Sequence, residues 1–102
     1  MKIFAITYYL KEETHSCDCN DENHHHHHDI RDDYEITGHI KELGTWAHFM
    51  PTSFLLKSDL SANEILDKLK NYLEKVDLLF VTEVNENSVA SLTPAVIEWI
   101  KK

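Results

Sequence analysis

One stretch of the chain, residues 12–33, cannot contribute to a hydrophobic core because it contains a single large aliphatic residue, Ile30. A segment with so little apolar surface cannot offset the conformational entropy that it would lose on ordering. The fold must therefore be built from the other 80 residues. We expect one domain, residues 1–102, in which residues 12–32 form a polar loop insertion, because single domains commonly run to about 100–150 residues.

The negative charge of the chain is concentrated in the same stretch. Residues 12–33 carry eight acidic side chains against Arg31, so they account for −7 of the net charge of −8. The rest of the chain is nearly neutral, and its basic residues form no cluster beyond Lys101 and Lys102. Phosphate backbones are held mainly by clustered Lys and Arg. Nucleic-acid binding is therefore disfavoured for a monomer, although a groove between two subunits could gather scattered lysines.

No targeting or membrane-spanning segment is expected. The first apolar run, residues 3–10, has the length of a strand and is followed by Lys11 and two glutamates rather than by a small-residue cleavage site. No other run approaches the roughly 20 apolar residues that cross a bilayer. We expect a cytoplasmic protein with no membrane partner, in which Cys17 and Cys19 are thiols rather than a disulfide.

Apolar periodicity predicts four strands and three helices. The strands are expected at residues 2–10, 45–50, 52–58 and 76–84, and the nearly continuous apolar run of the last one predicts a place in the interior of a sheet. A first helix is expected between an Asp32 or Asp33 cap and a left-handed Gly44. A second helix, residues 62–73, begins with a capping box of Ser61 and Glu64, and a short third helix follows Pro94.

This order of elements predicts an α+β, ferredoxin-like βαββαβ fold: a four-stranded antiparallel sheet with two helices on one face, plus a short C-terminal helix. The first and fourth strands carry apolar residues on both faces. The second face of the sheet must then be covered by the terminal helix, by a partner subunit, or by both, because large exposed apolar patches are rare on monomers. We therefore expect a homodimer.

Several segments resemble small bacterial proteins of the "SinR family". They are residues 2–10, the run Gly44-Thr45-Trp46-Ala47-His48, residues 52–56, residues 59–65, and the run LLFVTEV. Those proteins in turn resemble the small CRISPR adaptation subunit and VapD-type ribonucleases. The resemblance covers about residues 1–11 and 33–85. It implies a ferredoxin-like dimer in which the segment after the fourth strand often crosses to the partner.

For the CRISPR-type relatives, the resemblance further implies a metal-dependent endoribonuclease centred on an aspartate at the end of the first strand. This chain departs from that pattern because Tyr9 occupies the position of the expected aspartate. A phenol is a poor ligand for Mg²⁺, which prefers carboxylate oxygens. Only Glu12 or Glu13 could replace the aspartate, so we assign no catalytic residue and keep the Mg²⁺-dependent nuclease as the alternative function.

The insertion holds most of the soft metal ligands of the chain. They are His15, Cys17, Cys19, His24, His25, His26, His27 and His28. Imidazole and thiolate together favour Zn²⁺ or Ni²⁺ over Mg²⁺, and a zinc site needs about four such ligands. Five consecutive histidines offer many equivalent chelates without enforcing one geometry. A non-catalytic metal-binding role is therefore favoured over metal catalysis, which needs a fixed open coordination position.

Two other interpretations of the histidine run stay open, namely a low-complexity expansion with no selected role and an internal purification tag. The histidines outside the insertion support no site. His48 is expected to be a packed strand residue and His39 to face solvent on its helix, and neither has a matching nucleophile and acid nearby. Trp46 and Trp99 are expected to be core or interface anchors.

Overall fold

The computed structural model describes residues 1–11 and 32–102. The elements are β1 (Lys2–Tyr9), α1 (Tyr34–Glu42), β2 (Thr45–Met50), β3 (Ser53–Ser58), α2 (Ala62–Leu69), the 3₁₀ helix η1 (Lys70–Tyr72), β4 (Leu78–Glu83) and α3 (Pro94–Lys101). The strands form one antiparallel sheet in the order β2-β3-β1-β4. This arrangement confirms the predicted ferredoxin-like α+β fold.

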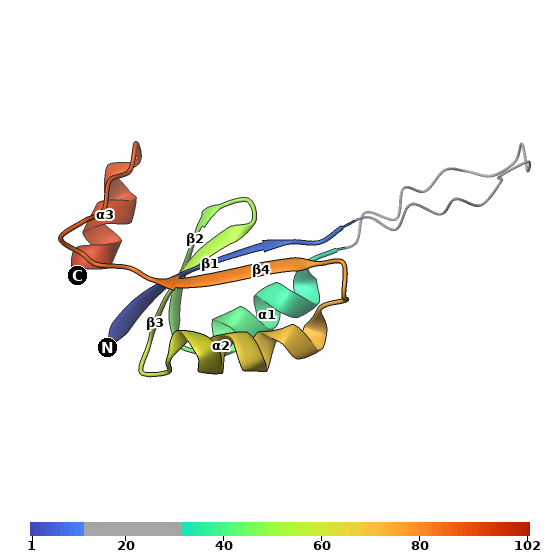
Figure 1. Cartoon of the computed structure of the whole chain (residues 1–102). Helices are drawn as coiled ribbons and strands as arrows, with labels where there is room; N and C mark the ends of the chain where they lie inside the picture. Colours follow the sequence, from blue (N-terminus) through green and yellow to red (C-terminus); the bar gives the residue numbers. More distant parts are fainter. Residues whose placement is uncertain (12–31) are drawn as a thin grey trace, which may run out of the picture.

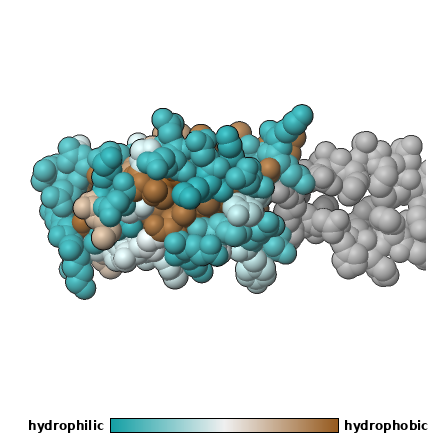
Figure 2. Space-filling view, turned by 90° about the horizontal axis from the view of Figure 1, so that it is seen from below, coloured by the Kyte–Doolittle hydropathy of each residue, from teal (hydrophilic) through white to brown (hydrophobic). Residues whose placement is uncertain are grey.

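The two faces of the sheet are covered by different helices. Helices α1 and α2 lie against one face, which we call the inner face, and α3 lies on the side of the other, outer face (Figure 1). Seen from the helical side, hydrophobic residues occupy a central area bordered by hydrophilic ones (Figure 2). The apolar surface on this side is therefore limited by the polar faces of the helices.

The core is built on the inner face by the alternation of strand side chains. Phe4, Ile6 and Tyr8 of β1 point inward and are at most 2% exposed. In the register of the sheet, Phe4 lies opposite Leu56 and Ile6 opposite Phe54. The helices add further buried side chains at i, i+4 spacing, Ile36 and Ile40 from α1 and Ile65 and Leu69 from α2. Full burial of side chains of this size stabilises the fold by about 1.5–3 kcal/mol each.

Strand β4 lies at the edge of the sheet, so the prediction that it occupies the interior was wrong. Its apolar run is continuous because both of its faces are apolar. Leu79 and Val81 pack against the core on the inner face. Leu78 and Phe80 point to the outer face and are 64% and 63% exposed. The sequence pattern reports the two faces of a strand, and it does not report how many neighbouring strands bond to it.

Both predicted ends of α1 differ in detail from the structure. Asp33 is the N-cap residue, but its side chain makes no bond to the helix. At the other end Leu43 is the C-cap in a right-handed conformation, and no described glycine has a positive φ. A Cβ atom on Gly44 would overlap the backbone carbonyl oxygen of Lys57. Gly44 is therefore required by the close approach of β3 and not by a left-handed turn.

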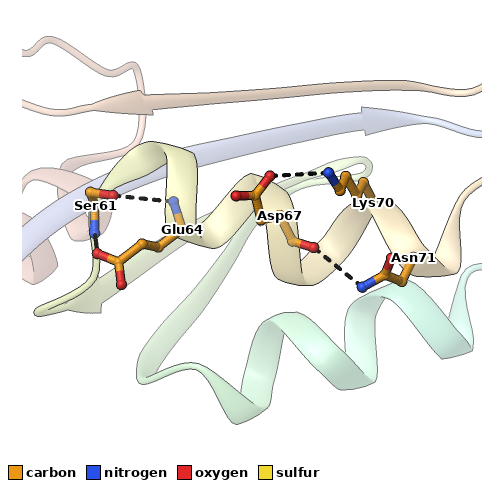
Figure 3. Close-up of polar contacts among 5 residues, drawn as sticks. All are labelled: Ser61, Glu64, Asp67, Lys70 and Asn71. Carbon is orange, nitrogen blue, oxygen red and sulfur yellow. Dashed lines mark hydrogen bonds and ion pairs between the residues drawn. The ribbon is translucent and has the colours of Figure 1, made fainter.

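Helix α2 begins with the predicted capping box. The Ser61 hydroxyl accepts from the Glu64 amide at 3.1 Å, and the Glu64 carboxylate accepts from the Ser61 amide at 3.1 Å (Figure 3). The α-helix ends at Leu69, four residues earlier than predicted, and continues as η1. At this transition the Lys70 ammonium group pairs with the Asp67 carboxylate at 3.2 Å, while the Asn71 side-chain Nδ2 donates to the Asp67 backbone carbonyl oxygen (Figure 3).

Candidate functional site

The predicted metal ligands lie outside the described residues. This holds for His15, Cys17, Cys19, His24, His25, His26, His27 and His28, and also for Glu12 and Glu13 of the alternative nuclease site. Within residues 1–11 and 32–102, no group of three or more His, Cys, Asp or Glu side chains could hold a metal ion.

The described residues on either side of the insertion are fixed to the domain by hydrogen bonds. On the β1 side, the Lys11 amide donates to Asp77 Oδ1 at 3.1 Å. Asp77 Oδ2 also accepts from the Glu74 amide at 2.8 Å, which places this carboxylate in the turn before β4. On the α1 side, the Tyr8 hydroxyl donates to Asp33 Oδ2 at 2.6 Å. The domain thus anchors both chain ends that enter residues 12–31.

The bond between Tyr8 and Asp33 was missed from the sequence, where Asp33 was interpreted as a helix cap. Burial raises the pKa of the Tyr8 phenol well above its ordinary range, and the hydrogen bond to Asp33 and the negative charge of Asp33 raise it further. The phenol therefore stays protonated as a donor. The signal for this bond was present, because Tyr8 occupies an inward position of β1 and a buried phenol needs a polar partner.

Tyr9, which occupies the position of the expected aspartate, lies at the end of β1 on the outer face. It is 55% exposed and lies opposite Leu78 of β4. Thr7, two residues earlier on the same face, lies opposite Phe80. The cross-strand neighbour of Tyr9 is the apolar Leu78, and this suits a contact surface better than a cation site.

The histidines of the folded part are engaged in ring contacts. His39 was expected to face solvent, but its ring stacks on Tyr72 with centroids 3.6 Å apart and lies 3.6 Å from the Glu42 carboxylate. His48 stacks on Phe54 at 4.4 Å, and its Nε2 is 3.2 Å from the Pro51 carbonyl oxygen. His48 nevertheless stays exposed, so it packs on Phe54 at the surface and is not a buried residue.

Both tryptophans lie beneath lysine ammonium groups. The Lys41 ammonium is 4.5 Å from the ring centroid of Trp46, which is 41% exposed at the β2 edge. The Lys57 ammonium is 4.5 Å from the ring centroid of Trp99 in α3. The second contact links α3 to β3, because a cation over an indole face is attracted by the ring quadrupole.

A groove lies between the outer face of the sheet and the C-terminal segment, and we call it the C-terminal groove. It has a volume of about 480 Å³. The sheet side of its lining includes Ala5, Phe49, Met50, Leu55 and Val84; the C-terminal side includes Val89, Leu92, Val96, Ile97 and Ile100. Such a lining offers apolar contact area and no group for acid–base or metal chemistry.

The helices of the described ranges are too short, or too polar, to cross a bilayer. In comparisons with protein-family models, curated proteins and solved structures, this chain has no match.

Proposed function

We propose that this protein is a non-catalytic metal-binding module that takes up Zn²⁺ or Ni²⁺ through the ligands of the insertion and that it works as a homodimer. The position of the donor set carries the proposal. Eight thiol and imidazole ligands fall between residues 15 and 28. The residues that flank the insertion, Lys11 and Asp33, are hydrogen-bonded to a domain whose hydrophobic core contains none of these ligands. Metal can then bind without any rearrangement of the core.

The chemistry of the donors supports the choice of metal. Thiolate and imidazole favour Zn²⁺ and Ni²⁺ over Mg²⁺ and Ca²⁺. Both donors must be deprotonated to bind, so affinity should fall as the pH is lowered below about 8.5 where thiols are used and below about 6.5 where imidazoles are used. This pH dependence is expected for whichever subset of the eight ligands is used.

Calorimetric titration tests the binding. Untagged protein should bind Zn²⁺ or Ni²⁺ with a submillimolar Kd, and a variant with Cys17 and Cys19 changed to Ser and His24–His28 changed to Ala should not. A matched control replaces His39 and His48, the histidines of the folded part, by Ala, and should keep the affinity of the wild type. Unchanged affinity in the first variant would exclude the insertion as the site.

Elemental analysis separates a resident metal from a tract that binds metal only when it is supplied. Protein purified without a nickel column should contain close to one Zn or Ni per chain. Metal-free protein that binds only added ions would contradict a resident metal and favour the low-complexity or tag interpretation of the histidine run. The endoribonuclease alternative makes a separate prediction, namely RNA cleavage that needs Mg²⁺ and stops with EDTA, whereas the binding module should cleave nothing.

The homodimer is supported by the outer face of the sheet, where large apolar side chains stay exposed at the end away from the C-terminal groove. Phe80, Leu78 and Tyr9 are each more than half exposed. Sedimentation equilibrium should give twice the chain mass of 11.9 kDa at micromolar concentration. A chain that stays monomeric at about 1 mM, where association is worth only about 4 kcal/mol, would exclude a functional dimer.

A further inference from the structure

The outer face of the sheet has two unlike ends. At one end, where β1 finishes and β4 begins, Tyr9, Leu78 and Phe80 project from the sheet, and we call these three residues the apolar ridge. In the register, Tyr9 lies opposite Leu78, and Thr7 lies between Phe80 and Ser53. Thr7 also bonds to the Ser53 hydroxyl at 2.9 Å. At the other end, beginning at Ala5 and Leu55, lies the C-terminal groove.

The exposed area is at the upper end of what a monomer usually leaves uncovered. The ridge residues are 55–64% exposed, and Met50 and Leu92 at the rim of the groove are 51% and 104% exposed. These five side chains together expose on the order of 600 Å², which approaches the roughly 800 Å² that each partner contributes to a standard protein interface. The face is thus large enough for a stable contact with another protein.

A surface that carries both a ridge and a groove can be complementary to itself. In a two-fold dimer each subunit presents the same patch, so every contact occurs twice. We consider a two-fold axis that lies between the outer faces of the two copies, perpendicular to the strands and near Thr7. Such an axis reverses the strand direction of one copy relative to the other. It therefore lays the ridge end of each subunit over the groove end of its partner.

From this match we propose that the occupant of the C-terminal groove is the apolar ridge of a second copy of this chain. The inference rests on the proposed homodimer and adds its interface and its orientation. The apolar lining of the groove fits the aromatic and leucine side chains of the ridge, because aromatic residues in desolvated pockets dominate interface energies.

Two charge substitutions test the interface. Phe80→Glu places a carboxylate on the ridge, and Leu92→Lys places an ammonium group at the rim of the groove. Each side chain is mostly or fully exposed in the subunit, so the fold should tolerate both changes, and circular dichroism checks this. Each variant alone should raise the dimer Kd by about 100-fold or more, because an unpaired charge would be buried twice. The matched control is Tyr34→Glu, which alters a 79% exposed side chain of α1 on the helical side.

Mixing the Phe80→Glu and Leu92→Lys proteins tests the orientation. In the mixed dimer one contact joins the introduced carboxylate of one subunit to the introduced ammonium group of its partner, and the other contact keeps both original residues. The mixture should therefore dimerise at least tenfold more tightly than either variant alone, as measured by sedimentation equilibrium. If ridge packed on ridge instead, Leu92 would lie outside the contact, and the Leu92→Lys protein alone would dimerise as tightly as the wild type.

The outcomes separate this inference from the proposed function. A dimer that survives both single substitutions would overturn the interface while leaving the homodimer intact. If the wild type is monomeric and carries a bound apolar molecule in native mass spectrometry, the groove is the site of a small ligand. That result would overturn both the interface and the proposed homodimer. Zinc titration of the Phe80→Glu protein gives an independent readout, because metal binding should persist in the monomer.

Discussion

Gly44 and Gly38 are the only glycines of the chain, and the structure assigns them opposite sensitivities. A Cβ on Gly44 would overlap the Lys57 carbonyl oxygen, whereas no heavy atom beyond its own helix backbone lies within 4 Å of a Cβ on Gly38. Gly44→Ala should destabilise the protein by about 1–3 kcal/mol because β2 and β3 must separate. Gly38→Ala should stabilise it by up to about 1 kcal/mol, because alanine is the better helix former. Urea denaturation measures both, and equal effects would contradict the close approach at Gly44.

The bond between Tyr8 and Asp33 should make stability sensitive to alkaline pH. The pKa of Tyr8 is raised in the folded state relative to the unfolded state. The protonated phenol therefore contributes its full stabilisation below about pH 10, the ordinary pKa of tyrosine, and this contribution declines above that pH. Tyr8→Phe should cost about 1–2 kcal/mol at pH 7, where the hydrogen bond to a carboxylate is lost. The difference between wild type and variant should shrink by up to about 1.4 kcal/mol per pH unit above pH 10. A difference that stays constant from pH 7 to pH 11 would contradict this linkage.

At the scale of single elements, α2 depends on its capping box. Ser61 and Glu64 satisfy two backbone amides that the first turn cannot bond internally. Ser61→Ala should therefore lower the free energy of unfolding by about 1 kcal/mol. Ser88→Ala, at an exposed turn after β4, is the matched control and should change it by less than about 0.5 kcal/mol. Thermal melts of the two variants that coincide would show that the box contributes nothing.

Most elements could be predicted from sequence because their signals are local. The alternation in β1, the capping box of α2 and Pro94 at the start of α3 each act within a few residues, and the structure agrees with them. The predictions were wrong where the structure of a residue depends on a group that is far away in the sequence. The edge position of β4 depends on strand order, Gly44 depends on the backbone of β3, and Asp33 bonds to Tyr8, 25 positions away. The metal ligands were predicted from composition alone and stay a prediction.

At the scale of the whole molecule, the proposed functions divide between two parts of the chain. The folded part supplies the core and the outer face, and it holds both flanks of the insertion through Lys11 and Asp33. The insertion supplies the soft ligands and most of the negative charge. The proposed metal ligands and the proposed dimer surface fall on different residues, so we expect the two functions to be separable by a single deletion.

Replacing residues 12–31 with a short Gly/Ser linker tests this separation. The linker closes the same connection with fewer residues, and loop-closure entropy changes by only about 0.6 kcal/mol for each halving of loop length. The shortened chain should therefore keep its cooperative unfolding and its dimer Kd within about threefold, and it should lose binding of Zn²⁺ and Ni²⁺. An insertion of the same length with every Cys and His changed to Ser is the matched control and should behave like the deletion. If the deletion dissociated the dimer while the control did not, the length of the insertion would be part of the subunit contact.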